Sequence, residues 1–179
     1  MTQPAIPDSA GWQQLWTIDA GSVLLQPVTR RIAREVLDGG PATRAFADGA
    51  LHARIPQAMG IAIRDIDSGA AAVLPTVWLV VRRADGQILG DIGTHGPPDS
   101  EGCVEIGYAL APSARGQGIG TAAVAALVSR LAAMPGIRRL TAVTGGENTA
   151  SLRLLERLGF HRTGPVPGTD DVRYTLSLS

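Results

Sequence analysis

The sequence predicts a mixed α/β domain in which helices pack on a mostly antiparallel sheet. Three strand-like segments follow one another at residues 76–83, 87–95 and 103–111, and the loops between them are short enough for antiparallel pairing. The spacing of apolar residues then changes to that of a helix over residues 116–134. Strand-like and helical segments alternate from there onward, which predicts helices covering the sheet.

Length and composition limit the classes of protein to consider. The chain has 179 residues, of which 45% are hydrophobic, and this length favours one domain with a substantial core. Its formal net charge of +0 argues against a globally basic nucleic-acid-binding protein or a polybasic membrane-surface protein. Cys103 is the only cysteine, and no histidines have ligand spacing, so we expect no disulfide and no metal. The pattern of a secretory signal or membrane span is absent, which predicts a cytoplasmic protein with no membrane partner.

The N-terminal part gives weaker signals. We expect residues 1–20 to form a tail or packing segment and residues 21–179 to form a single domain. The first ten residues contain two prolines and few apolar side chains, which predicts a loose tail. Trp12 and Trp16 are four residues apart, as on one face of a helix packed against the domain. Alternatively, these two side chains line a substrate site.

The first strand is predicted at residues 22–28. A helix then begins at Thr29, and the residues spaced for its apolar face are Ile32, Val36 and Leu37. The Gly39-Gly40-Pro41 sequence ends this helix. Residues 41–72 are rich in alanine and predict one or two short helices and a loop.

In the C-terminal part, segments with helical spacing of apolar residues alternate with strand-like segments. The helix within residues 116–134 has an apolar stripe formed by Ile119, Val124, Leu127, Val128 and Leu131. Residues 138–144 predict a strand. Asn148 is a good N-cap for a helix that ends near Leu158, and its inner face comprises Leu152, Leu155 and Leu158. Residues 172–179 alternate in polarity and predict the last strand.

A glycine-rich loop at the start of a helix is the strongest chemical signal. Gly116, Gly118 and Gly120 alternate along it, so the backbone can approach a ligand closely. The first N–H groups of a helix have no intrahelical partner, and with the helix dipole they form a site suited to a pyrophosphate. Arg115 adds a fixed positive charge. The alternative is a tight structural turn without a ligand.

Two other phosphate-binding loops fit less well. A P-loop needs a lysine after its last glycine, whereas Thr121 follows Gly120, which argues against a nucleoside triphosphate. Gly118, Gly120 and Ala123 satisfy the dinucleotide pattern G-x-G-x-x-A, although several residues separate these glycines from the strand. A nicotinamide-dependent oxidoreductase therefore remains an alternative.

Three landmarks resemble the GNAT family of N-acetyltransferases. The sequence Arg115-x-x-Gly118-x-Gly120 resembles that family's acyl-CoA loop, Q/R-x-x-G-x-G/A. The sequences EIGYALAP and NTASLRLLERLGF are similar to the landmarks on either side, in wording closest to the branch with the ribosomal-protein N-terminal acetyltransferases. The resemblance covers residues 76–165. It implies the acyl-CoA N-acyltransferase fold, an α/β (α+β) architecture with about seven strands and helices on both faces.

The resemblance also implies a reaction and a binding site. An acetyl group would pass from acetyl-CoA to a primary amine, on a protein N-terminus or a small molecule, by direct attack in a ternary complex. Backbone groups of Ala109 and Leu110 would hold the pantetheine arm, and Asn148 would face this arm or the thioester. The pyrophosphate would bind the N–H groups of Gly116, Gln117, Gly118, Ile119, Gly120 and Thr121. Dimers are frequent among similar proteins, so a homodimer is one option.

Glu105 is the candidate base, because an amine attacks only after losing a proton. Alternation along its strand places Glu105 with Gly107 and Ala109, small residues that leave room for a ligand. The alternative role is an ion pair with an arginine. Asp91 and His95 share this side and are secondary candidates for binding a cationic acceptor, although we expect His95 to be a solvated residue beside the following loop.

Ser151 is the second catalytic candidate. In the branch that this sequence resembles, a serine here can approach the sulfur of CoA, and the alternative is an ordinary residue at a helix N-terminus. The family often has a tyrosine acid four residues later, where this chain has Leu155. Tyr108 is expected on the side opposite Glu105 and so is not assigned that role. The missing tyrosine leaves a non-catalytic acyl-CoA-binding module as an alternative function.

Overall fold

The computed structural model describes residues 9–48 and 54–178. Within these residues, eight strands form one sheet in the order β1-β2-β3-β4-β5-β6-β8-β7. All neighbouring strands pair antiparallel except β5 and β6, which run parallel. The strands are β1 (Ile18–Ala20), β2 (Val23–Pro27), β3 (Val77–Arg82), β4 (Ile88–Thr94), β5 (Cys103–Leu110), β6 (Arg139–Gly145), β7 (His161–Pro165) and β8 (Asp171–Ser177).

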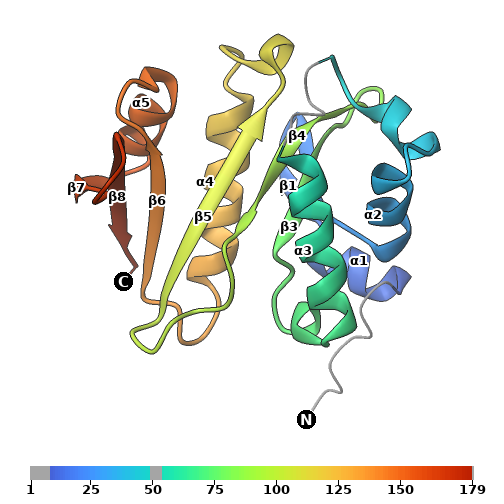
Figure 1. Cartoon of the computed structure of the whole chain (residues 1–179), viewed down its shortest axis with the longest axis horizontal. Helices are drawn as coiled ribbons and strands as arrows, with labels where there is room; N and C mark the ends of the chain where they lie inside the picture. Colours follow the sequence, from blue (N-terminus) through green and yellow to red (C-terminus); the bar gives the residue numbers. More distant parts are fainter. Residues whose placement is uncertain (1–8, 49–53, 179) are drawn as a thin grey trace.

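Helices cover both faces of the sheet, as the sequence predicts. Figure 1 shows α3 in front of the sheet and α4 behind it. The α-helices are α1 (Ala10–Trp16), α2 (Arg30–Leu37), α3 (Ile55–Asp67), α4 (Ile119–Ala132) and α5 (Thr149–Arg157). The mixed, mostly antiparallel fold class is therefore confirmed, with eight strands instead of about seven.

The two tryptophans of α1 pack into the domain, which confirms that part of the prediction. Trp12 is completely buried, and its Nε1–H donates to the carbonyl of Ala71 at 3.0 Å. Trp16 makes an edge-on contact with Trp78 at 6.5 Å between ring centroids. The guanidinium of Arg130, on α4, lies 4.7 Å from the centroid of the Trp16 ring. The first eight residues of the expected tail lie outside the described residues.

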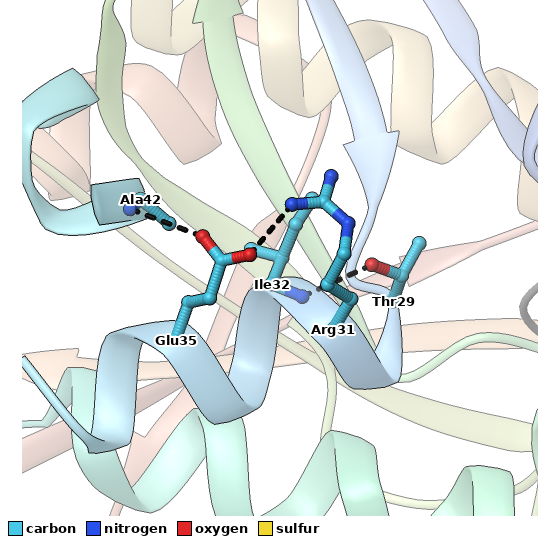
Figure 2. Close-up of polar contacts among 5 residues, drawn as sticks. All are labelled: Thr29, Arg31, Ile32, Glu35 and Ala42. Carbon is cyan, nitrogen blue, oxygen red and sulfur yellow. Dashed lines mark hydrogen bonds and ion pairs between the residues drawn. The ribbon is translucent and has the colours of Figure 1, made fainter. Parts of the chain in front are cut away.

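Helix α2 starts where the sequence predicts, with Thr29 as its N-cap, and is connected to the segment that follows it. Figure 2 shows the Thr29 hydroxyl accepting a hydrogen bond from the N–H of Ile32, at 3.2 Å. It also shows the Glu35 carboxylate between the guanidinium of Arg31, at 2.7 Å, and the N–H of Ala42, at 3.2 Å. The second contact joins α2 to the short 3-10 helix η1 (Pro41–Ala45). Capping of this kind stabilises a helix by roughly 1 kcal/mol.

The apolar face predicted for α2 is wrong at one position. Leu37 is 44% exposed, whereas Ala33 is completely buried and Val36 is 7% exposed. Leu37 is the last residue of the helix. The ends of helices are the part that a sequence pattern defines least well.

Three elements of the fold were not specified by the sequence pattern. Strand β1 has only three residues, and β7 contains a glycine and a proline and shows no alternation of polarity. The alanine-rich segment contains the 13-residue helix α3, longer than the short helices expected there. The remaining predicted strands and helices are present, with their ends shifted by up to three residues.

The parallel pair β5 and β6 is joined over only part of its length. Cys103–Ile106 pair with Arg139–Ala142, and no pairing continues beyond Ile106 and Ala142. The remaining residues of β5 stay paired with β4, and those of β6 stay paired with β8. The two strands therefore separate in the middle of the sheet, and this separation creates the site.

Candidate active site at the separation of β5 and β6

A cavity of about 790 Å³ occupies the gap between the separated ends of β5 and β6. Its walls come from β5, from β6 and from the first turns of α4 and α5. Ten of the twelve site residues predicted from the sequence line it: Glu105, Ala109, Leu110, Arg115, Gly116, Gly118, Gly120, Thr121, Asn148 and Ser151. The two exceptions are Gln117 and Ile119.

The hydrogen-bond ladder determines which backbone groups of β5 face this gap. The N–H of His95 donates to the Glu105 carbonyl at 2.8 Å, and the N–H of Ala111 donates to the Leu89 carbonyl at 2.7 Å. Because the direction alternates along a strand, the odd-numbered residues of β5 bond toward β4. The backbone groups of Tyr108 and Leu110 therefore face the gap. The backbone of Ala109 bonds toward β4 instead, so Tyr108, and not Ala109, offers backbone groups to the gap beside those of Leu110.

The glycine loop has the backbone geometry that its sequence predicts. Gly116 and Gly118 have φ values of 73° and 78°, a region that side chains disfavour, and Gly118 is the N-cap of α4. The Nε–H of Arg115 donates to the carbonyl of Leu110 at 3.1 Å, which fixes the loop to the end of β5. The start of α4 is thereby directed at the gap, with its unpaired N–H groups.

Gln117 and Ile119 contribute no side chain to the gap. The amide of Gln117 donates to the carbonyl of Ser113 at 2.7 Å, and the side chain of Ile119 is buried in the core. Their backbone N–H groups belong to the loop and to the first turn of α4, where the sequence analysis places their role.

Asn148 connects α5 to β6 at the opposite wall. Its Oδ1 accepts from the N–H of Ser151 at 3.2 Å, and its Nδ2 donates to the Thr144 hydroxyl at 3.2 Å. It is therefore the predicted N-cap of α5, and its side chain also borders the gap. Leu155 lines the same wall and is completely buried.

Tyr108 is a site residue that the sequence analysis set aside. Its Oη lies 2.6 Å from the Oγ of Ser151, so a phenol from β5 reaches across to α5. Burial raises the pKa of Tyr108, and the hydrogen bond from Ser151 lowers it by a smaller amount. The expected side of the strand is confirmed, but the gap opens on that side as well. The only signal in the sequence for this role was the presence of a tyrosine in the strand. The structure shows that it lies two residues after Ile106, where pairing with β6 ends.

Glu105 has a specific partner in His95, which is exposed as expected but also makes a hydrogen bond that the sequence did not predict. Nδ1 of His95 lies 2.8 Å from Oε1 of Glu105, and the two residues face each other across β4 and β5. The exposed fractions of their side chains are 49% for His95 and 33% for Glu105. The alternative considered for Glu105, an ion pair with an arginine, is replaced by this contact with a histidine.

A second cavity, of about 570 Å³, lies on the Glu105 face of the sheet beneath α3. Asp65 and Asp91 contribute carboxylates to it, and Oδ2 of Asp65 accepts from the Thr76 hydroxyl at 2.6 Å. The cavity meets the gap along β5, because five residues line both: Arg54, His95, Gly107, Tyr108 and Ala109. The site therefore comprises two adjoining chambers, and His95 and Tyr108 are among the residues that line both.

The charges of the gap favour an anionic ligand. Among the described residues that line it, two carry carboxylates, Glu105 and Asp171, and four are arginines, Arg54, Arg115, Arg153 and Arg157. Among residues 9–48 and 54–178, no three histidine, cysteine or acidic side chains form a group that could hold a metal ion. No helix in the same residues has the length and apolar character to cross a bilayer.

Comparison with known proteins identifies the family. The family model described as an acetyltransferase (GNAT) domain matches residues 20–161, which is most of the chain. The chain belongs to the GNAT family. The Bacillus subtilis protein YjdG, named an uncharacterized N-acetyltransferase, is 34% identical over 83 residues, or 46% of this chain. The match spans about half the length of the curated relatives, 49% of YjdG.

Solved GNAT structures share the fold at low sequence identity. A ribosomal-protein-S5-alanine acetyltransferase from Vibrio fischeri is 14% identical, with a TM-score of 0.69 over 91% of this chain and 97% of its own. RimL, a ribosomal L7/L12 alpha-N-protein acetyltransferase in complex with coenzyme A, is 18% identical, with a TM-score of 0.66 over 90% of this chain and 98% of its own. The GNAT fold expected from the three landmarks is therefore confirmed.

Proposed function

We propose that this GNAT protein transfers an acetyl group from acetyl-CoA to a primary amine, which attacks the thioester directly in a ternary complex. The observation that carries the proposal is the cavity at the separation of β5 and β6, with a second cavity adjoining it beneath α3. The larger chamber has the cationic lining and helix N-terminus that a CoA phosphate chain needs. The smaller chamber has two aspartates that can bind a cationic amine, along with two arginines, and His95 lines both chambers.

The donor is held mainly by backbone groups. The N–H groups of residues 116–121 bind the pyrophosphate, and Arg115 adds charge while it fixes the loop to β5. The gap-facing carbonyl groups of Tyr108 and Leu110 accept from the amides of the pantetheine arm, as they would from an added strand. Asn148 lies at the opposite wall, toward the thioester end.

The acceptor amine must lose a proton to the protein. Alkyl amines have a pKa of about 10.4, so an attacking amine needs a base close to the thioester. The hydrogen-bonded pair of Glu105 and His95 supplies that base: His95 lines both chambers, and Glu105 lines the larger one beside it. The oxyanion that forms on attack accepts a hydrogen bond from the gap-facing N–H of Leu110.

The sulfur of CoA leaves on the other side of β5. A thiol has a pKa of about 8.5, by analogy with cysteine, so it leaves readily and a proton donor only assists. The Tyr108 phenol, linked to Ser151 at 2.6 Å, lies on that side. A phenol, with an ordinary pKa of about 10, carries its proton at neutral pH, and burial raises the pKa of Tyr108 further, so it is protonated when the sulfur departs and can donate to it.

A cytoplasmic location goes with this proposal. Cys103 is a free, partly buried thiol, as is usual in reducing compartments. We propose that the acceptor group is a primary amine, on a protein N-terminus or on a small molecule.

Calorimetric titration with acetyl-CoA, NADH and ATP tests the binding half of this proposal. We expect saturable binding of acetyl-CoA alone, and we expect Arg115→Ala to weaken it without unfolding the protein. Arg173→Ala is the matched control, since Arg173 is an exposed arginine of β8 that borders neither chamber. Selective binding of NADH would contradict the proposal and favour an oxidoreductase. Binding of acetyl-CoA with no CoA release in the presence of any amine would favour a binding module.

A further inference from the structure

His95 occupies the junction of the two chambers, whereas Glu105 does not. The lining of the smaller, acceptor-side chamber includes His95 but not Glu105, and both residues line the larger chamber. An amine that enters from the acceptor side therefore reaches the imidazole of His95 before it reaches the carboxylate. A base must lie within hydrogen-bond distance of the proton that it removes, so this placement distinguishes the two residues.

The orientation of the His95 ring leaves one nitrogen available for the amine. Nδ1 faces Oε1 of Glu105 at 2.8 Å, and Nε2 lies over the backbone of Gly107. A Cβ atom at position 107 would be only 2.8 Å from Nε2, so the ring occupies space that a side chain would otherwise fill. An ionised carboxylate only accepts hydrogen bonds, and this places the proton of the neutral ring on Nδ1. Nε2 then carries the lone pair, directed away from Glu105.

We propose that His95 is the residue that takes the proton from the acceptor amine, and that Glu105 is a positioning residue that holds the required tautomer of His95. The proposal rests on the acetyl transfer proposed above. The amine nitrogen bonds to the thioester carbon, its extra proton passes to Nε2, and the C–S bond breaks with its electron pair on sulfur. The imidazolium then returns its proton to water. The arrangement has the logic of an acid–base–orienter triad, in which the base itself is held by a carboxylate.

Other charged and titratable groups share the environment of this ring. They come from the segment before α3, from α3, from β4 and from β5, and they are Arg54, Arg64, Asp65, Asp91 and Tyr108. The two arginines and the two aspartates balance in charge. The direct hydrogen bond of Glu105 to Nδ1 is therefore the contact that orients the ring.

Substitution and chemical rescue test the proposal. We expect His95→Ala to lower kcat by about 10² to 10⁴, the usual contribution of a general base, with little change in KM for acetyl-CoA. Added imidazole should restore part of the rate in His95→Ala, in proportion to the concentration of neutral imidazole. Glu105→Gln should retain more activity than His95→Ala, because a Gln carbonyl oxygen can still accept from Nδ1–H. His161→Asn is the matched control, since His161 is exposed on β7 and borders neither chamber. Turnover of His95→Ala within about threefold of wild type, or loss of activity in Glu105→Gln alone, would overturn the proposal.

The tautomer of His95 provides a second test that needs no acceptor. Nitrogen-15 NMR of the free protein should show a neutral His95 ring protonated on Nδ1, and Glu105→Ala should abolish this preference. A ring protonated on Nε2 in the wild type would overturn the assignment of His95. Failure of the wild type to acetylate any amine, with the Nδ1 tautomer present, would instead overturn the proposed function. The two failures are therefore distinguishable.

Discussion

The phenol oxygen of Tyr108 and the hydroxyl oxygen of Ser151 lie 2.6 Å apart, although 43 residues separate them in the chain. Tyr108 projects from β5 and Ser151 from the first turn of α5, so the contact bridges the two walls of the gap. Leu155 occupies the position where the family resemblance leads one to expect a tyrosine. A phenol is present in the gap after all, but it comes from the strand.

Removal of this phenol should slow the reaction without preventing donor binding. We expect Tyr108→Phe to lower kcat by about tenfold to a hundredfold, at or below the low end of general-acid effects, because a thiol already leaves readily. Ser151→Ala should have a smaller effect, since Ser151 acts through the phenol. Steady-state kinetics at saturating acetyl-CoA measure both. A wild-type kcat in Tyr108→Phe would show that Tyr108 is not the proton donor.

Stability at alkaline pH should also depend on Tyr108. Burial raises its pKa in the folded protein, so the folded state retains a proton that the unfolded state loses above pH about 10. Stability is therefore retained below that pH and falls as pH rises through the folded-state pKa. Burial also raises the pKa of Tyr174, so the fall should be shallower in Tyr108→Phe but should not vanish. Urea midpoints measured at pH 8 and at pH 10.5 test this. An equal decrease of the midpoint in the wild type and in Tyr108→Phe would contradict it.

The glycine loop allows backbone strain to be separated from donor binding. Gly118 and Gly86 have similar left-handed φ values, 78° and 74°, and neither would meet a neighbour if it gained a Cβ. Either glycine replaced by alanine should cost about 1–2 kcal/mol of stability. Only Gly118→Ala should also weaken acetyl-CoA binding, because Gly86 lies in the turn between β3 and β4, away from both chambers. Equal affinities in the two variants would exclude the loop as the phosphate site.

The N-terminal helix is expected to be part of the folded domain. Trp12 is completely buried and bonded to the carbonyl of Ala71, so Trp12→Ala should cost about 3–5 kcal/mol. Leu15, on the same helix, is 51% exposed, and Leu15→Ala should change stability by no more than about 0.5 kcal/mol. Thermal unfolding of both variants distinguishes a packed segment from a separable tail, for which both substitutions would have small effects.

The sequence predicted the order of most elements because their periods are clear. The change from alternation in β5 to a helical stripe in α4 is unambiguous, and the glycines between them mark the loop. Strand β1 is too short for a pattern, and β7, with Gly164 and Pro165, has none. These two strands exist because neighbouring strands pair with them, which is tertiary information.

The candidate site was predicted less completely, because it depends on register. The alternation of side chains along β5 correctly placed Glu105 and Tyr108 on opposite sides of the strand. It could not show that β5 and β6 part after Ile106, so that both sides of β5 open into the gap. Likewise, the contact of His95 with Glu105 depends on how β4 pairs with β5 across a loop whose geometry the sequence does not define.

A crystal structure of the protein with acetyl-CoA tests the central claim most directly. The account predicts the phosphates at the N–H groups of residues 116–121 and the thioester carbonyl within about 3 Å of the Leu110 N–H. It also predicts the sulfur beside Tyr108 and Ser151, with the acetyl carbon facing the smaller chamber and His95. Acetyl-CoA bound with its phosphates in the smaller chamber, or with its thioester away from the junction, would contradict the account.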